Sequence, residues 1–387
     1  MKPASLYATT GKIGKSMLLS LPMLLLTFMF ITQGRPDFSS GPAIFAFLAT
    51  FVFLNALFFL MLYTGKTDRY RAIGFVAMAL FFALVFIVNL VRMRGSMSFS
   101  DQNLLSCEIP FCHIVTTMII IPVALTKTII FPGSILTGFA SIASMLVIVV
   151  GVSLALGRGF CSWGCFYGGW DDGASRILRR PRIKKVNPNW CWFSFAFLLF
   201  IALVSAITLS PTYCDWFCPF KTVTEFQKVT DFTILMKTVV FLSLFTGLVI
   251  ILPLLTKKRM QCGTFCPMGA LMSFTNKINP FEVKIDKEKC NNCRKCIKTC
   301  PTFSMVESSM EKGSPEFTCM KCGKCIDDCA QQAIQYHIRG TQPGKGITAA
   351  RTLFLYPAFT LLVIFAGSDI QYGITLIIKL VSTGHLL

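Results

Sequence analysis

Charged residues are scarce in this chain of 387 residues, because Asp, Glu, Lys and Arg together make up only 14% of it. A soluble globular protein usually carries about a quarter of its residues as these four types. The shortfall is concentrated in uncharged stretches at residues 18–34, 38–65, 72–91, 128–157, 186–214, 238–256 and 352–368. Several of them reach the roughly 20 residues that a helix needs to cross a bilayer core. This pattern excludes a soluble enzyme and predicts a polytopic α-helical membrane protein.

Histidine is also rare, and the whole chain has only His113, His337 and His385. A haem held by paired histidines within the membrane is therefore not expected. No glycine-rich dinucleotide fingerprint follows a predicted strand, so the sequence indicates no flavin site and no hydride chemistry. We assign no catalytic residue.

Acidic residues are few, with 18 Asp and Glu against 37 Lys and Arg, which gives a formal net charge of +19. Such an excess can indicate nucleic-acid binding. The basic residues, however, cluster beside the apolar stretches, where cytoplasmic loops of membrane proteins keep their Lys and Arg. We therefore predict that these basic residues lie beside a membrane, and we predict no nucleic-acid partner.

The same bias predicts about seven spans and one re-entrant segment. With the N-terminus inside, the spans cover residues 18–31, 43–63, 72–91, 135–156, 192–209, 238–255 and a last stretch from Arg351. Gly367, Ser368 and Asp369 are expected to interrupt the last span. Residues 114–131 are expected to re-enter, because the basic loop 176–185 then falls inside. A full crossing by residues 114–131 is the alternative.

These assignments divide the chain into four parts. Residues 1–95 form N-terminal transmembrane helices, and residues 96–280 form a transmembrane core with cysteine pairs. Residues 281–346 form an inserted α+β two-cluster ferredoxin domain, and residues 347–387 form a C-terminal membrane segment. Lys257, Lys258 and Arg259 precede the ferredoxin domain at the inner end of a span. This predicts a multi-pass protein of a prokaryotic cytoplasmic (inner) membrane, with that domain facing the cytoplasm. Asp171 and Asp172, on the inner side, are expected to be solvated.

Seventeen cysteines stand out against this background. Two runs follow the pattern C-x2-C-x2-C-x3-C, and in two-cluster bacterial ferredoxins the fourth cysteine of each run binds the other cluster. The spacing predicts one [4Fe–4S] cluster held by Cys290, Cys293, Cys296 and Cys329. A second would be held by Cys319, Cys322, Cys325 and Cys300. Zinc knuckles, the alternative, usually contain paired CxxC units. Alternating apolar residues at 281–285 and 333–338 predict short flanking strands.

Nine cysteines lie outside these runs, and eight of them form pairs. Three of the pairs have three residues between their members, a spacing that places both thiols on one face of a helix, and the pair Cys107 and Cys112 has one residue more. The topology places two pairs on each side, and four thiolates are the number that one cluster needs. We therefore predict an inner membrane cluster held by Cys161, Cys165, Cys262 and Cys266. An outer membrane cluster would be held by Cys107, Cys112, Cys214 and Cys218. The metal in all four sites would be iron, and the membrane clusters could be [4Fe–4S] or [2Fe–2S].

Two further points concern the cysteines outside the ferredoxin runs. A disulfide is the alternative for the pairs on the outer side. Cys191 lies in a Trp-Cys-Trp step at the start of a span, and we predict that it is a buried core residue.

The segments Cys214-Asp-Trp-Phe-Cys218-Pro219 and Cys262-Gly-Thr-Phe-Cys266-Pro267, together with the double ferredoxin motif, resemble the membrane polyferredoxin family. That family includes the quinol dehydrogenase subunit of periplasmic nitrate reductase systems and the C-terminal half of the nitrous oxide reductase regulator. The resemblance covers residues 135–339. Three features depart from the family: Phe166 in place of proline after Cys165, the additional pair Cys107 and Cys112, and the longer N-terminal part.

The resemblance implies electron passage between a cytoplasmic or quinone donor or acceptor and a partner redox enzyme. The partner would be an oxidoreductase subunit or a soluble redox protein, and a quinol dehydrogenase role is one form of this function. The rival hypothesis is an assembly, redox-sensing or metal-reducing maturation factor for a respiratory enzyme. A plain membrane anchor with structural cysteine pairs is the third.

Overall fold

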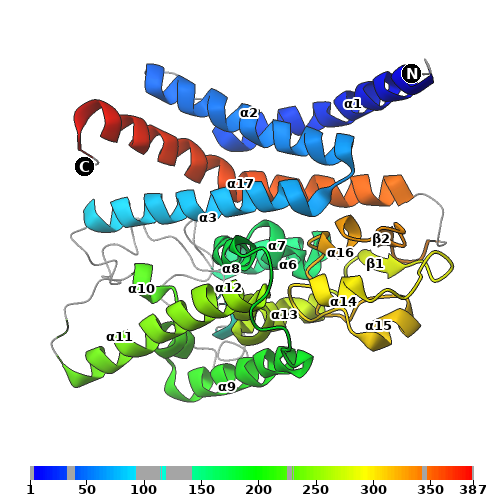
Figure 1. Ribbon diagram of the computed structural model, residues 1–387. Coiled ribbons are helices and arrows are strands. Elements are labelled where there is room, and N and C mark those ends of the chain that lie inside the picture. Colours follow the sequence, from blue (N-terminus) through cyan, green and yellow to red (C-terminus); the bar gives the residue numbers. More distant parts are fainter. Residues whose placement is uncertain are drawn as a thin grey trace.

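The computed structural model describes residues 4–32, 40–92, 114, 116–118, 142–224, 229, 231–341 and 347–385. The described chain is mostly helical, and its long helices form one layer (Figure 1): α1 (Ala4–Thr32), α2 (Gly41–Thr64), α3 (Thr67–Arg92) and α17 (Ile347–Thr383). Helix α17 packs against α1, α2 and α3, so the end of the chain returns to its beginning.

Shorter elements lie below this layer and carry the cysteine pairs (Figure 1). In chain order they are α6 (Ile142–Ala155), η2 (Gly157–Gly159), α7 (Phe160–Trp163), α8 (Phe166–Ile177), η3 (Pro188–Trp192), α9 (Phe193–Thr208), η4 (Tyr213–Phe217), α10 (Lys221–Thr224), α11 (Phe232–Leu244), η5 (Phe245–Ile251), α12 (Leu252–Thr256), η6 (Gln261–Phe265) and α13 (Pro267–Thr275).

Six helical stretches in the described chain are long and apolar enough to cross a membrane: Lys12–Thr32, Gly41–Thr64, Thr67–Val88, Pro188–Thr208, Phe232–Thr256 and Thr348–Thr383. Their outward faces expose large apolar side chains, such as Leu25 at 70% and Phe232 at 76%. Surface of this kind is suited to lipid hydrocarbon. The expectation of several membrane helices is therefore confirmed.

The described residues contain a seventh candidate span only if two helical segments joined at a sharp bend are counted as one span. Residues Leu146–Ala155 and Gly157–Trp163 meet at an angle of 105°. Gly157 at the bend has a φ of +59°, a conformation that glycine adopts without steric cost. The bend turns the first cysteine pair into the interior, where Cys161 and Cys165 are buried. Most of the segment that was expected to re-enter, residues 114–131, lies outside the described residues.

The expected interruption of the last span is wrong. Helix α17 continues through Gly367, Ser368 and Asp369 to Thr383. A continuous helix satisfies its own backbone hydrogen bonds, which hydrocarbon cannot do for an interrupted one. A Cβ at Gly367 would lie 2.9 Å from Cγ1 of Ile31, so the glycine allows close approach of α1 rather than ending the helix.

The polar segment after α13 is closed by a pair of short strands. Strand β1 (Phe281–Ile285) pairs antiparallel with β2 (Ile334–Ile338), with Val283 opposite Tyr336. Three short helices lie between the strands: α14 (Lys295–Thr299), α15 (Glu307–Lys312) and α16 (Lys324–Asp327). The expected strands are thus confirmed, and their pairing brings the two cysteine runs to one end of the molecule.

The polar segment shares one hydrophobic core with the membrane helices. Tyr336 of β2 stacks on Phe354 of α17, with ring centroids 4.4 Å apart, and Trp163 of α7 packs edge-on against the same ring at 6.1 Å. The fully buried side chains of these three residues join strand, span and cysteine turn. The segment therefore packs directly against the spans.

A carboxylate adds a polar contact to this junction. Asp327 of α16 accepts hydrogen bonds from the backbone N–H groups of Thr67, Asp68 and Arg69, at 2.9, 2.7 and 3.3 Å. These groups belong to the first turn of α3, where N–H groups have no partner within the helix and the helix dipole favours negative charge.

Replacing Asp327 by Ala should lower the free energy of unfolding of the polar segment by about 1–2 kcal/mol, because a charged cap of α3 is lost. Thermal unfolding monitored by limited proteolysis in detergent would measure this. Asp328→Ala, at the half-buried neighbouring position, should cost less than about 0.5 kcal/mol. Equal losses from both changes would contradict the capping contact.

Candidate metal centres

Each predicted set of ferredoxin cysteines lines its own cavity. One cavity is lined by Cys290, Cys293, Cys296 and Cys329. The other is lined by Cys300, Cys319, Cys322 and Cys325. In both, one cysteine comes from the other run, so the structure brings together the sets that ligand exchange requires. Within the described residues, no three His, Cys, Asp or Glu side chains converge on the position of a single metal ion.

The two cavities differ in their exposure to solvent. Cys293 of the first is exposed, whereas Cys300 and Cys322 of the second are buried. Burial raises the pKa of Cys319 to about 11 and that of Cys322 to about 12. A metal ligand has to be deprotonated, so iron binding would release protons from these thiols.

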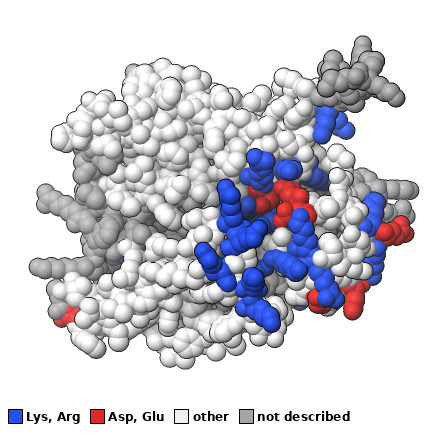
Figure 2. Space-filling model, viewed as in Figure 1, with Lys and Arg blue, Asp and Glu red and all other residues white. Residues whose placement is uncertain are grey.

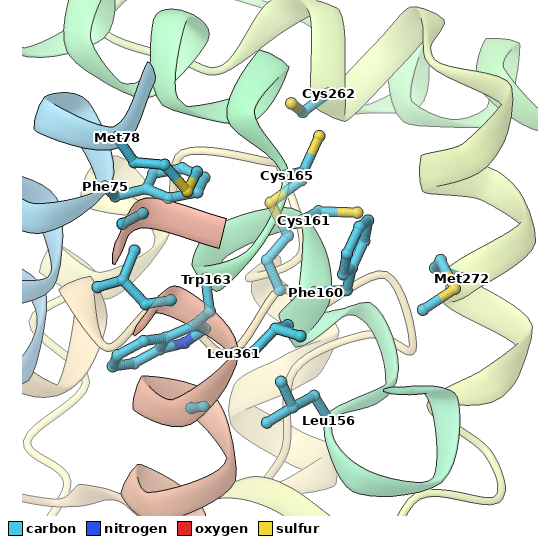
Figure 3. Close-up of a cluster of buried hydrophobic side chains, with 14 of the residues drawn as sticks. Phe75, Met78, Leu156, Phe160, Cys161, Trp163, Cys165, Cys262, Met272 and Leu361 are labelled. Atoms are coloured by element: carbon cyan, nitrogen blue, oxygen red, sulfur yellow. The ribbon is translucent and has the colours of Figure 1, made fainter. Parts of the chain in front are cut away.

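The thiols of the two inner pairs also lie close to one another. Burial raises the pKa of Cys266 to about 12, and the negative charge of Cys161 contributes to the increase. Burial likewise raises the pKa of Cys165 well above its usual value, with further contributions from Cys161 and Cys266. Figure 3 shows Cys161, Cys165 and Cys262 in one buried region beside Phe160. The structure therefore brings together all four residues of the predicted inner set.

The two inner pairs share a longer pattern, Arg-x2-Cys-x3-Cys-x2-Gly, which we call the inner motif. Its first copy is Arg158, Cys161, Cys165 and Gly168, and its second copy is Arg259, Cys262, Cys266 and Gly269. The pair Cys214 and Cys218 has Pro211 and Lys221 at the corresponding positions and lacks the pattern. We did not predict the arginines, although their spacing is visible in the sequence.

Local backbone geometry is shared by all three described pairs. Cys165, Cys218 and Cys266 each end a helical turn in extended conformation, with ψ angles of 107°, 108° and 118°. The turn is α-helical in α7 and π-helical in η4 and η6. Single π turns are frequent at functional sites because they change the direction of the side chains within a helix.

The arginines of the two inner motifs bind reciprocally. Nη2 of Arg158 donates to the carbonyl oxygen of Cys262 at 2.9 Å, and Nη2 of Arg259 donates to the carbonyl oxygen of Cys161 at 2.7 Å. Each arginine thus holds the first cysteine of the other motif. Nη2 of Arg259 also lies 3.4 Å from Sγ of Cys262, within hydrogen-bonding reach of a predicted ligand atom.

The glycines of the motif leave room for these bonds. A Cβ at Gly168 would lie 2.5 Å from Nη2 of Arg259 and 2.6 Å from the carbonyl oxygen of Cys161. A Cβ at Gly269 would lie 2.9 Å from the carbonyl oxygen of Cys262 and 3.3 Å from Nη2 of Arg158. A larger side chain at either position would displace the arginine of the opposite motif.

The two arginines carry positive charge into the interior. Arg158 is 1% exposed and Arg259 is 0% exposed, and in the described part of the chain neither reaches ion-pair distance of an acidic side chain. Their Nε atoms have no hydrogen-bond partner there either. A buried cation is costly unless an anion lies nearby. Four cysteine thiolates around iron and sulfide form such an anion, so these residues fit an iron–sulfur cluster.

The expectation that Asp171 and Asp172 are solvated is wrong, because they are 0% and 1% exposed. Asp171 accepts a hydrogen bond from the backbone N–H of Cys262 at 2.8 Å. Burial raises the pKa of Asp171 to about 7, although the charge of Arg259 opposes the increase. Both aspartates lie on the amphipathic helix α8, whose burial depends on contacts with distant segments.

Asp172 belongs to a separate, self-neutralised ion network. It pairs with Arg71 at 3.0 Å and with Arg176 at 3.2 Å, while Asp68 pairs with the same two arginines at 2.7 and 2.6 Å. Although burial opposes it, the charges of Arg71 and Arg176 hold the pKa of Asp172 below its usual range. Although burial opposes it, the negative charges of Cys262, Asp172 and Asp171 raise the pKa of Arg259. Neither aspartate forms an ion pair with this arginine.

Buried side chains also connect the inner site to the second ferredoxin cavity. Arg158 donates to the carbonyl oxygen of Thr318 at 2.8 Å, next to Cys319, and the backbone N–H of Arg259 donates to the carbonyl oxygen of Pro301 at 2.8 Å, next to Cys300. The residues that hold the inner pairs therefore also contact the loops around the second ferredoxin cavity.

A buried lysine strengthens the same junction. Nζ of Lys321 donates to the carbonyl oxygen of Leu156 and to the side-chain oxygens of Asn276 and Asn279, at 3.0, 2.9 and 2.7 Å. Burial lowers the pKa of Lys321 to about 7. We did not predict this role, since Lys321 looked like one more basic residue among the ferredoxin ligands.

The outer set is only half described, because Cys107 and Cys112 lie outside the described residues. Cys218 is buried and Cys214 is half-buried. Tyr213, which precedes Cys214, is fully buried and accepts a hydrogen bond from Nε2 of Gln261 at 3.1 Å. Because Gln261 precedes Cys262, this bond links the pair to the second inner motif. The grouping of the outer set stays a prediction.

Cys191 has the core position that we predicted. It is 7% exposed and packs with Met260 and Phe303 in a small hydrophobic cluster separate from the main core.

Family models match the segments that carry these sites. The model "4Fe-4S binding domain" matches residues 137–185, 190–229 and 238–287, and each segment contains one cysteine pair. The model "4Fe-4S dicluster domain" matches residues 282–330, which contain all eight ferredoxin cysteines. The chain therefore carries binding domains for [4Fe–4S] clusters, and no solved structure matches it.

Curated relatives match about half of this chain. A protein of Escherichia coli K12 named YccM is 26% identical over 209 residues, which make up 51% of this chain and 56% of that protein. The ferredoxin-type protein NapH of the same organism is 26% identical over 211 residues, 53% of this chain and 70% of NapH. The methylamine utilization ferredoxin-type protein MauN of Methylobacillus flagellatus is 26% identical over 227 residues, 57% of this chain and 76% of MauN.

Replacing Gly168 by Ala should lower the free energy of unfolding by about 1–3 kcal/mol, because the added methyl group overlaps Arg259 and Cys161. The inner site should lose iron as its two motifs separate. Anaerobic iron analysis and thermal unfolding of the purified variant would measure both effects.

The matched control is Gly263→Ala within the second motif, where an added Cβ meets no atom closer than 3.5 Å. This variant should keep the iron content of the wild type. If the two variants behave alike, the contact of Gly168 with the arginine does not determine the site.

Proposed function

We propose, from this chain's membership in the membrane polyferredoxin family, that it conducts single electrons through iron–sulfur clusters between the two sides of a membrane. The relatives NapH and MauN are named ferredoxin-type proteins, and this chain carries binding domains for [4Fe–4S] clusters, which supports iron–sulfur electron transfer. We propose in addition that the electrons pass through the membrane. This step rests on the position of the inner site beside the second ferredoxin cavity.

The observation that carries the proposal is the pair of buried arginines. Arg158 and Arg259 each contact a cysteine of the inner set and a loop of the second ferredoxin cavity. Neither arginine forms an ion pair with a described acid, and an anionic cluster between the motifs would balance their charge. A structural role for these cysteines would leave both cations buried without an ion-pair partner, with only the carboxylates of Asp171 and Asp172 in the neighbourhood of Arg259.

We assign the ligands accordingly. The first ferredoxin cluster would be held by Cys290, Cys293, Cys296 and Cys329, and the second by Cys300, Cys319, Cys322 and Cys325. The inner membrane cluster would be held by Cys161, Cys165, Cys262 and Cys266. The outer cluster would include Cys214 and Cys218 and, as the sequence predicts, Cys107 and Cys112.

The cofactor supplies reversible one-electron chemistry, and the protein sets the conditions for it. Burial of the inner cysteines excludes water from their thiolates. Arg259 lies within hydrogen-bonding distance of Sγ of Cys262 and favours the more negative, reduced form of the site. Tyr213 and Gln261 connect the inner motif to the pair Cys214 and Cys218 through one hydrogen bond.

The distribution of charge supports the orientation. On the face in Figure 2, Lys and Arg gather at the end that carries the ferredoxin segment, and most of the remaining surface is uncharged. Cytoplasmic sides of membrane proteins carry this excess. We therefore propose that the ferredoxin segment faces the cytoplasm of a prokaryote and that the partner is a redox enzyme or a quinone.

Single replacements of Cys161 and Cys262 by Ala test the shared inner site. They lie in different motifs, 101 positions apart in the sequence (262 minus 161). Both should abolish the same centre in anaerobic electron paramagnetic resonance spectra and should remove about four iron atoms per chain if the cluster is [4Fe–4S]. The ferredoxin signals should persist.

Cys191→Ala is the matched control, since Cys191 is equally buried but has a core role. It should retain every centre. Loss of two different centres from the two inner variants, or no loss at all, would contradict the assignment.

A further inference from the structure

Five lysines form a cationic surface around the ferredoxin sites. We call it the basic face, and it consists of Lys257, Lys258, Lys295, Lys298 and Lys324. These residues come from the end of a span, from α14 and from α16, so they meet only in the folded chain. Figure 2 shows basic side chains gathered in this part of the surface.

The lysines of the basic face lie close together. Nζ of Lys258 donates to the carbonyl oxygens of Lys298 and Cys300, at 2.8 and 2.6 Å. Helix α16, which carries Lys324, packs on α14, which carries Lys295 and Lys298. In the described part of the chain, none of the five forms an ion pair with an acid. Such crowding leaves a positive field that an acidic surface would complement.

The basic face adjoins the most accessible of the cysteine sites. Cys293 is the exposed member among the described cysteines, and Lys295 lines the same cavity. The cysteines of the second and inner sites are buried or half-buried. Exchange of an electron with a molecule in solution is therefore most direct at the site of Cys293.

Two kinds of anionic surface could meet these lysines, namely lipid head groups and an acidic protein. Helix α14, which carries Lys295 and Lys298, packs on α16, and α16 packs on the start of α3. The membrane-edge loop at residues 179–185 supplies the basic residues that are suited to lipid. Lys295 and Lys298 are exposed on the ferredoxin segment beside Cys293, which favours a protein partner.

We propose that the basic face is the docking surface of a soluble, acidic, one-electron carrier protein. This inference rests on the proposed function, because it names the partner class of the first ferredoxin site. In each exchange, one electron leaves the reduced carrier and enters the site held by Cys290, Cys293, Cys296 and Cys329. The carrier is oxidised by one electron, the site is reduced by one electron, and no bond or proton is transferred.

The test is stopped-flow reduction of the purified, cluster-loaded chain in nanodiscs, with reduced flavodoxin as a small acidic probe. The double variant Lys295→Gln and Lys298→Gln should lower the second-order rate constant by at least about tenfold at low ionic strength. The difference should vanish in about 1 M salt, where the Debye length is about 3 Å.

The charge-matched control is the double variant Lys184→Gln and Lys185→Gln on the exposed membrane-edge loop. It should keep the wild-type rate constant within about twofold, in neutral nanodiscs and in nanodiscs that contain anionic phosphatidylglycerol. Equal rate constants for both double variants would overturn the proposal. So would an effect of Lys295 and Lys298 that appears only with the anionic lipid, since the face would then bind lipid.

Dithionite separates this proposal from the proposed function. In about 1 M salt, where the negative charge of dithionite is screened, both double variants should be reduced by dithionite as fast as the wild type, because a small reductant needs no docking surface. A wild-type chain that dithionite cannot reduce would contradict the proposed function itself, whereas an unchanged flavodoxin rate would contradict only the docking surface.

Discussion

Two hydrogen bonds between the inner motifs determine how the membrane core is arranged. Arg158 holds the carbonyl oxygen of Cys262, and Arg259 holds the carbonyl oxygen of Cys161. The motifs lie about a hundred residues apart in the chain, on either side of the spans Pro188–Thr208 and Phe232–Thr256, yet the arginine of each motif binds the other motif. Because both guanidinium groups are buried, breaking one bond would leave a charge with reduced hydrogen bonding, at a cost of several kcal/mol.

The remaining features depend on this reciprocal clamp. Gly168 and Gly269 leave the space in which each arginine reaches the opposite motif. The bend at Gly157 directs the first motif into the interior. The same arginines bind the loops of the second ferredoxin cavity, so the polar segment docks where the inner site forms. Tyr336, Phe354 and Trp163 seal this junction with aromatic contacts. Aromatic packing and the hydrogen bonds of the buried arginines therefore stabilise the same junction, between the inner site and the second ferredoxin cavity. The proposed path for electrons runs through this junction.

Some parts of this arrangement could be predicted from local sequence. Cysteine spacing determines which thiols can surround one cluster, and the cavities contain the predicted sets, Cys300 and Cys329 included. The strands at residues 281–285 and 334–338 follow from alternating apolar residues. Long uncharged stretches predict the membrane helices, because the bilayer imposes a length and an apolar composition on each of them.

Other parts depend on contacts between distant segments. Asp171 and Asp172 have the polarity of solvated residues, and only the packing of α8 against the core shows that they are buried. Gly367 belongs to the residues expected to interrupt the last span, whereas in the structure it allows close contact with Ile31. The arginines of the inner motif are a different case, since their spacing from the cysteines is regular. Their function became apparent only when the structure placed each one on the opposite motif.

The most direct test of electron passage through this chain uses sealed liposomes that enclose ferricyanide, with dithionite outside and a potassium ionophore to cancel the membrane potential. Loaded wild-type protein should bleach the enclosed ferricyanide at a rate proportional to the number of chains per vesicle. The Cys262→Ala variant should bleach it no faster than protein-free liposomes, because its inner site is lost while its ferredoxin sites persist. Equal bleaching by wild type and variant, or none by the wild type, would contradict a path through the inner site.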